Sequence, residues 1–132
     1  FFSQVNWGVS TVKPYISAGN KELIDLLKPE ANSGITVTGN GFYGPQGRVL
    51  RIKTAHENLN EQLSQFEFNG VKIMNFEMET SALYALGTML GHKTATICAV
   101  IANRHLKEYS KDYKNTVDKM IVYVLEKLVE RE

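Results

Sequence analysis

Segments with the pattern of β-strands alternate along this chain with segments that have the pattern of α-helices, and this alternation constrains the fold more than any other feature. The strand-like segments are short apolar or alternating runs at 34–38, 71–75 and 94–102. The helix-like segments have apolar residues three or four positions apart, at 21–27, 58–66, 79–90 and 117–128. Such an alternation predicts an α/β fold, with a mainly parallel central sheet flanked by helices.

The third strand-like segment differs from the others in its continuous apolar character. Its run from Ile97 to Ala102 contains no polar side chain except the thiol of Cys98. A run of this kind predicts a strand buried on both faces, as in a parallel sheet. A further short extended piece is expected at 49–52, whereas residues 1–18 have no clear pattern.

Composition narrows the classes of function. The 132 residues are 43% hydrophobic and carry a net charge of +1, which fits one globular domain and gives no strong field toward nucleic acid. No apolar stretch reaches the roughly 18–20 residues of a membrane helix, so no membrane partner is expected. Cys98 is the single cysteine and cannot form an internal disulfide; we expect a buried apolar residue in a cytoplasmic protein.

Polar stretches follow the three predicted strands, at the point where each strand ends. These stretches are 39–48, 77–79 and 103–105. Because the carboxyl ends of parallel strands meet at one edge of a sheet, and ligands bind beyond that edge, we expect the three stretches to form one site.

The second stretch contains two carboxylates, Glu77 and Glu79, on either side of Met78. Glu79 opens the next predicted helix, where the helix dipole stabilises a carboxylate, so a structural role at the helix start explains it. A carboxylate that accepts hydrogen bonds from both hydroxyls of a sugar also explains it, because both of its oxygens accept. Met78 offers a soft apolar surface suited to the face of a sugar or base.

The first stretch contains three side chains suited to a pyrimidine, and each of them is also an ordinary loop residue. The amide of Gln46 both donates and accepts, so it can pair with the N–H and C=O groups of the base edge. Arg48 supplies a fixed fork of donors, and its charge would stabilise the negative charge of a departing pyrimidine. Phe42 could stack on the base.

The sequence argues against two other kinds of site, a dinucleotide-binding loop and a metal site. Gly39, Gly41 and Gly44 have the spacing of a dinucleotide-binding loop, but Pro45 and Gly47 follow in place of the helix that this motif requires. The three histidines lack metal-ligand spacing and no second cysteine exists, so no metal site is expected.

Three stretches occur in an order and spacing that resemble one family, the uridine phosphorylases among the nucleoside phosphorylases. They read Phe42-Tyr43-Gly44-Pro45-Gln46-Gly47-Arg48, Asn75-Phe76-Glu77-Met78-Glu79-Thr80 and Val100-Ile101-Ala102-Asn103-Arg104. The resemblance runs from about residue 20 to the end and implies a part of that family's three-layer fold. Two departures occur: Gly44-Pro45 reverses the usual order, and Phe76 replaces tyrosine.

The resemblance implies a nucleoside-binding role for residues of all three stretches: Phe42, Gln46, Arg48, Glu77, Met78, Glu79, Ile101 and Arg104. It implies that Gln46 and Arg48 hold uracil and that Met78 and Glu79 hold ribose. Arg48 and Glu79 are therefore the expected catalytic residues. Ile101 would line the base pocket.

The implied reaction is reversible phosphorolysis by a pentosyltransferase: uridine and phosphate give uracil and ribose 1-phosphate. Phosphate is a co-substrate, no metal or organic cofactor is implied, and the family forms homo-oligomers, namely dimer-based hexamers. A nucleosidase, a purine nucleoside phosphorylase and a non-catalytic nucleoside-binding module are the alternatives. Asn103-Arg104 stands near the place of the aspartate of purine-specific relatives, which favours a pyrimidine.

The family's phosphate-binding loop and arginines belong to an N-terminal half that has no counterpart in this sequence, which also begins without Met. We therefore expect residues 1–132 to be the C-terminal portion of a single nucleoside phosphorylase-like domain. On its own, this portion is expected to be inactive.

Overall fold

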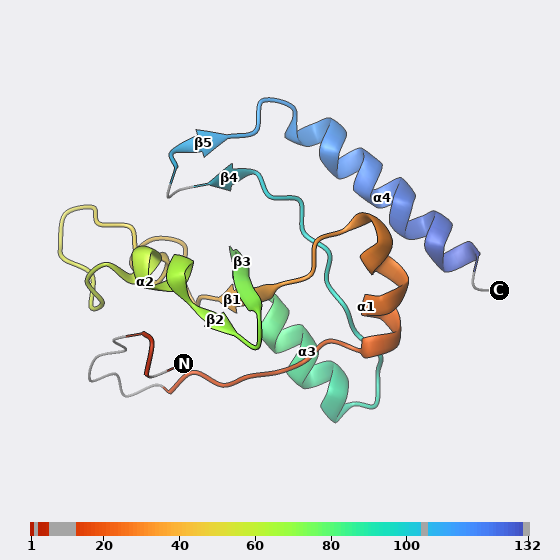
Figure 1. The fold of residues 1–132 in the computed structure, drawn as a ribbon, viewed down its shortest axis with the longest axis horizontal. Coiled ribbons are helices and arrows are strands. Elements are labelled where there is room, and N and C mark those ends of the chain that lie inside the picture. Colours follow the sequence, from red (N-terminus) through yellow and green to blue (C-terminus); the bar gives the residue numbers. More distant parts are fainter. Residues whose placement is uncertain (2, 6–12, 104–105, 131–132) are drawn as a thin grey trace.

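The fold combines four helices with two small sheets in the part of the chain that the computed structural model describes, namely residues 1, 3–5, 13–103 and 106–130 (Figure 1). The helices are α1 (Lys21–Leu27), α2 (Leu59–Gln65), α3 (Thr80–Met89) and α4 (Tyr113–Val129). The strands are β1 (Ile35–Thr38), β2 (Glu67–Phe68), β3 (Val71–Glu77), β4 (Ala102–Asn103) and β5 (Glu108–Tyr109). Two short 3-10 helices, η1 (Lys28–Glu30) and η2 (Gly44–Gln46), complete a mixed α/β fold.

The larger sheet has the strand order β1-β3-β2. β1 runs parallel to β3, with Ile35 opposite Ile73 and Thr38 opposite Glu77. β2 runs antiparallel to β3, and the turn between them places Asn69 and Gly70 at positive φ, as a tight hairpin requires. The predicted strands at 34–38 and 71–75 are therefore confirmed, and β3 extends two residues further than predicted.

The predicted third strand at 94–102 is wrong. Residues 92–101 form no regular secondary structure, and only Ala102–Asn103 pairs, antiparallel with β5 in a separate hairpin. Val100 is 60% exposed and Ile101 is 45% exposed, so the apolar run is not buried on both faces. An apolar run indicates a tendency to be buried, but a strand also requires a neighbour that exchanges backbone hydrogen bonds with it.

Other hydrogen bonds fasten this irregular segment to the helices. The N–H of Asn20 donates to the carbonyl of Thr94 at 2.7 Å, and the N–H of Thr96 donates to the hydroxyl of Tyr84, in α3, at 3.0 Å. The expected extended piece at 49–52 is also absent, since residues 50–52 form bends and Val49 belongs to no strand.

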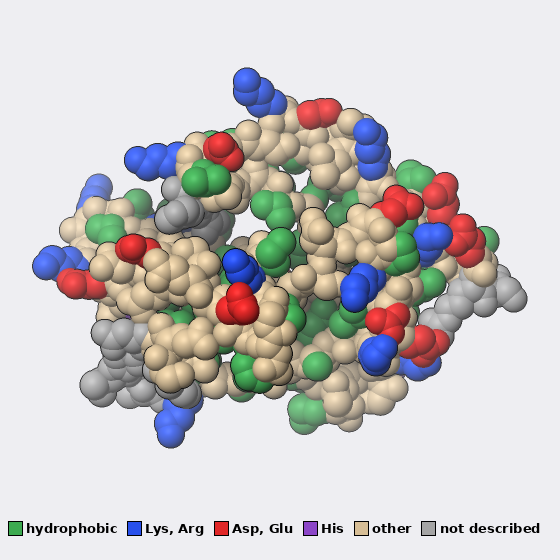
Figure 2. Space-filling model, in the orientation of Figure 1, with side chains coloured by type: hydrophobic (Ala, Val, Ile, Leu, Met, Phe, Trp, Pro, Cys, Tyr) green, Lys and Arg blue, Asp and Glu red, His purple; other side chains and the backbone are tan. Residues whose placement is uncertain are grey.

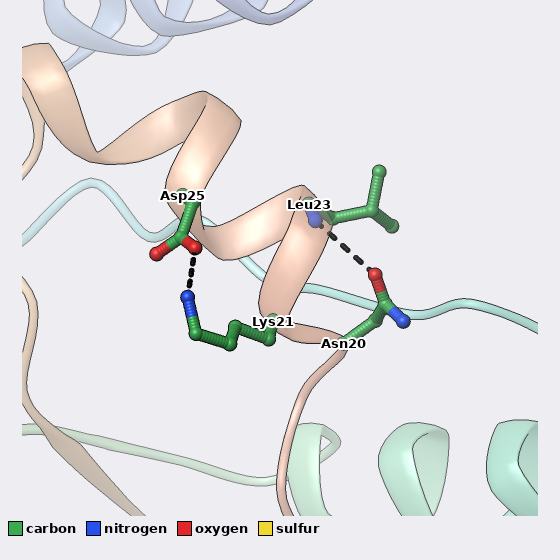
Figure 3. Close-up of polar contacts among 4 residues, drawn as sticks. All are labelled: Asn20, Lys21, Leu23 and Asp25. Carbon is green, nitrogen blue, oxygen red and sulfur yellow. Dashed lines mark hydrogen bonds and ion pairs between the residues drawn. The ribbon is translucent and has the colours of Figure 1, made fainter.

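The four predicted helices are confirmed. Asn20 caps α1 as a good N-cap residue does, because its side-chain oxygen accepts from the N–H of Leu23 at 3.2 Å, and Lys21 pairs with Asp25 one turn along (Figure 3). The hydroxyl of Tyr123 in α4 donates to the carbonyl of Leu27 at 2.9 Å and ties the last helix to the first.

The described core is small and lies between α2 and the larger sheet. Its buried members are Val5, Leu59, Leu63 and Phe66. Much apolar surface stays exposed, including Ile121 and Leu125 of the amphipathic α4. Figure 2 shows one face of the molecule hollowed near its centre, with hydrophobic side chains around the opening. Among the described residues, no helix is both long and apolar enough to span a bilayer.

Candidate functional site

The first two polar stretches meet at one edge of the sheet, as the parallel arrangement predicts. β1 and β3 end side by side, with Thr38 opposite Glu77. The pairing continues one step beyond β1, where the N–H of Gly39 donates to the carbonyl of Glu77 at 2.8 Å. The glycine-rich loop therefore leaves the sheet directly beside the residues that open α3.

The carboxylate of Glu77 is held by hydrogen bonds within the protein. Its Oε1 accepts from the hydroxyl of Thr38 at 2.6 Å, and its Oε2 accepts from the N–H groups of Glu79 and Thr80, each at 2.7 Å. The N–H of Ser81 donates in turn to the hydroxyl oxygen of Thr38 at 3.0 Å. Three N–H groups at the start of α3, which have no partner within the helix, are therefore satisfied from the strand ends.

These contacts shift the acidity of Glu77. Partial burial raises the pKa of this carboxyl, but the hydrogen bonds from Thr38, from the N–H groups of Glu79 and Thr80, and from the hydroxyl of Thr80 outweigh burial. The pKa of Glu77 is consequently lowered from its ordinary value of 4.5. Glu77 is a carboxylate at neutral pH, and its charge lies at the positive end of the α3 dipole.

Glu79 differs from Glu77 in both position and partners. It occupies the N-cap position of α3, yet its side chain makes no capping hydrogen bond. Its Oε2 accepts from the N–H of the neighbouring Met78 at 3.2 Å, and the residue is exposed. The structural role that the sequence suggested for Glu79 is thus performed by Glu77, and Glu79 presents its carboxylate at the surface. Met78 beside it is 38% exposed.

The glycine-rich loop sets three predicted site residues in different environments. The guanidinium carbon of Arg48 lies 3.5 Å from the centroid of the Phe42 ring, a cation–π contact, and Phe42 packs edge-on against Tyr43. Gln46 is only 2% exposed, so a base could reach its amide only if the groups that cover it moved. The loop forms the three-residue η2, which is capped by Gly47 at a φ of 72°, and no longer helix begins in the loop.

The third polar stretch was expected to reach the edge of the sheet at the end of a third parallel strand. That strand does not form, and Asn103 lies in a different element. Asn103 belongs to the β4–β5 hairpin, and the carbonyl of Ile101 accepts from the N–H of Ser110 at 2.8 Å at the base of this hairpin. Arg104 lies outside the described residues. The predicted roles of Ile101 and Arg104 stay predictions.

Cys98 is exposed, so the expectation of a buried residue is wrong. Neighbouring groups still crowd its thiol. The pKa of the Cys98 thiol is raised from its ordinary value of 9.0, mainly by partial burial and then by the negative charges of Glu77 and Glu79. A hydrogen bond with the side chain of Asn75 acts in the opposite direction. The irregular segment therefore passes close to the two carboxylates, although it does not form a strand.

Thr38, Thr80 and Thr96 are the residues that sequence reasoning missed. Thr96 accepts or donates a hydrogen bond with the hydroxyl of Tyr84 at 2.9 Å and lies 3.4 Å from the hydroxyl of Thr80. Such contacts join residues far apart in sequence. The one available signal for Thr38 was a hydroxyl residue at the end of a strand, where polar groups were already expected.

A separate cavity of about 500 Å³ lies between the end of the glycine-rich loop and α2. It is lined by Gly47, Val49, Lys53, Thr54, His56, Glu57, Asn58, Leu59, Asn60 and Glu61. None of the predicted nucleoside-binding residues lines this cavity. Among the described residues, no group of three or more potential metal ligands occurs.

Comparison with known proteins agrees with the motifs. The family described as the phosphorylase superfamily matches residues 12–130. A uridine phosphorylase of Thermococcus kodakarensis is 36% identical over 93 residues, which cover 68% of this chain and 32% of that protein. A uridine phosphorylase of Haemophilus influenzae is 30% identical over 95 residues, which cover 70% of this chain and 37% of that protein.

These matches confirm the resemblance to the uridine phosphorylase type. The chain spans about a third of the length of the curated relatives it matches. No solved structure matches the chain significantly.

The acidity of Glu77 predicts a specific loss of stability in acid. The pKa of Glu77 is lower in the folded than in the unfolded protein. Its carboxylate therefore contributes fully to the free energy of unfolding at pH values above 4.5, the ordinary pKa, and this contribution is lost as the pH falls through the lowered pKa. Urea unfolding between about pH 3 and pH 7 should show this decline for the wild type. Glu77→Gln should flatten it, whereas Glu61→Gln should not; equal slopes in all three proteins would contradict the assignment.

The environment of Cys98 predicts slow alkylation. Because only the thiolate reacts, the rate of reaction with iodoacetamide should reach half its maximum above pH 9.0. Mass spectrometry of the peptide that contains Cys98 measures this rate. Glu79→Gln removes a nearby negative charge and should accelerate the reaction at a fixed pH, unlike Glu126→Gln on α4. A midpoint at or below 9.0 would refute the described surroundings.

Proposed function

Because this chain belongs to the phosphorylase superfamily, we propose that it forms the ribose- and base-binding side of a uridine phosphorylase active site. The reaction is the reversible conversion of uridine and phosphate into uracil and ribose 1-phosphate. The observation that carries the proposal is the difference between two carboxylates at one sheet edge. Glu77 is engaged by Thr38 and the start of α3, whereas Glu79 is exposed.

The exposed carboxylate of Glu79 has the chemistry to hold a ribose. Two oxygens that only accept can take one hydrogen bond from each of the 2′- and 3′-hydroxyls. The partly exposed Met78 beside it supplies an apolar surface for the sugar. A fixed sugar allows charge to develop along the glycosidic bond without loss of alignment, which is the main contribution that positioning makes to such a reaction.

Arg48 and Phe42 are proposed to act together on the base. The contact between the guanidinium and the ring orients the plane of Arg48, and the N–H donors in that plane can then point at the carbonyl oxygens of uracil. A preorganised cation there stabilises the negative charge on the departing base. Gln46 would contribute once the groups that cover its amide move aside, and Ile101 and Arg104 would complete the base pocket.

Phosphate is proposed to bind elsewhere than at the start of α3. A helix N-terminus attracts anions through its unpaired N–H groups, but here Glu77 and Thr38 already accept from three of them. The phosphate-binding groups would come from the part of the polypeptide that corresponds to the rest of the relatives' length, and the enzyme would act as a homo-oligomer without a metal or organic cofactor. On this proposal, residues 1–132 alone do not turn over uridine.

Phosphate dependence tests the proposed reaction directly. The full-length gene product should convert uridine into uracil and ribose 1-phosphate only when phosphate is present, because phosphate is the attacking group. Absorbance measures the loss of uridine, and chromatography identifies the sugar product. Equal loss of uridine without phosphate, with free ribose as product, would identify a nucleosidase instead.

Glu79→Gln should weaken the use of ribosides selectively. The amide keeps one accepting oxygen but loses the charge, and hydrogen bonds to charged groups contribute about 1.5–3 kcal/mol, so kcat/KM for uridine should fall about 10- to 100-fold. The fall should be smaller for 2′-deoxyuridine, which lacks one of the two hydroxyls. The matched control is Glu61→Gln, which alters an exposed carboxylate in the first turn of α2. Equal losses on both substrates would argue against the ribose contact.

A further inference from the structure

The hydroxyl of Thr38 joins three elements at the strand edge. Thr38 is the last residue of β1, donates to Glu77 at the end of β3, and accepts from Ser81 in the first turn of α3. Glu77 in turn binds the N–H groups of Glu79 and Thr80. Met78 and Glu79 thus lie in a turn, and one hydrogen-bond network joins the two ends of this turn.

We propose that Thr38 and Glu77 are positioning residues that set the direction of the Glu79 carboxylate toward the ribose, and this inference rests on the proposed function. Glu77 is not itself a ribose ligand, in contrast to the role that the family resemblance implied. Its two oxygens together accept three short hydrogen bonds from the protein, at 2.6, 2.7 and 2.7 Å. A sugar hydroxyl would have to compete with these charge-assisted contacts.

The backbone of the turn explains why a positioning device is needed. Glu79 has φ of −127° and ψ of −31°, outside the helical values that begin at Thr80, so the helix does not fix its conformation. The hydrogen bond from its own N–H to Glu77 fixes the peptide that precedes it. If Thr38 no longer holds Glu77, the Glu77 carboxylate can rotate and the Glu79 backbone loses that restraint.

Two substitutions at Thr38 distinguish the effect of its hydroxyl group from the effect of its side-chain shape. Thr38→Val keeps the branched shape and removes the hydroxyl, whereas Thr38→Ser keeps the hydroxyl. Thr36→Val is the matched control, because Thr36 lies two residues earlier on the same strand, opposite Asn75 rather than Glu77. Steady-state kinetics of the full-length gene product with uridine and with 2′-deoxyuridine measures the effect, and circular dichroism verifies the fold of each variant.

A specific pattern is expected. Thr38→Val should raise KM for uridine about tenfold and reduce the preference for uridine over 2′-deoxyuridine, since a misdirected Glu79 loses its 2′-hydroxyl contact. Thr38→Ser should keep both the KM and the preference within about twofold of the wild type, and Thr36→Val should change neither. An unchanged riboside preference in a folded Thr38→Val protein would overturn the inference.

Glu77→Gln provides an independent test if Thr38→Val does not fold. The amide oxygen can accept from Thr38 or from the turn, but the amide nitrogen cannot accept from the other. The preference for uridine should again fall. An unchanged preference in folded Glu77→Gln would overturn the inference, and a wild-type enzyme that does not convert uridine with phosphate would instead refute the proposed function.

Discussion

The hydrogen bonds that Glu77 accepts at the junction of β1, β3 and α3 are the interaction on which the candidate site depends. They satisfy two N–H groups at the helix start and bind the hydroxyl of Thr38, which satisfies a third. An unpaired N–H at a buried helix end would be costly, and Thr80 here is buried. The same carboxylate therefore stabilises the fold and leaves Glu79 as the exposed acid.

Much of the apolar surface of the described residues is open. Only four hydrophobic residues are buried among those described, and side chains of α3, α4 and the irregular segment are exposed. The matched relatives are about three times as long as the region that aligns with this chain. Both observations support the proposal that this chain supplies the ribose and base side of the site and that the phosphate side comes from elsewhere.

Much of the local structure could be predicted from the sequence. The Asn20 cap, the helical spacing of α4 and the alternation of β1 are local signals, and each element occurs where expected. The irregular structure of residues 94–101 could not be predicted, because an apolar run does not show whether a neighbouring strand is available to pair with it. The expected burial of Cys98 was wrong for the same reason, because burial depends on what packs against the whole segment.

The candidate site shows the same division. Parallel strands brought the glycine-rich loop and Glu77 together as predicted, since topology alone determines that edge. The spacing of Glu77 and Glu79 could not show which of them caps the helix, because that depends on Thr38, 39 positions away. The 2% exposure of Gln46 also depends on tertiary packing that no local pattern records.

A crystal structure of the full-length gene product with bound uridine would test the central claim most directly. We predict that the two oxygens of Glu79 lie at hydrogen-bond distance, about 2.5–3.0 Å, from the 2′- and 3′-hydroxyl oxygens, while Glu77 keeps its contacts with Thr38 and the start of α3. A structure in which Glu77 leaves Thr38 and binds the ribose, with Glu79 turned away, would contradict the account.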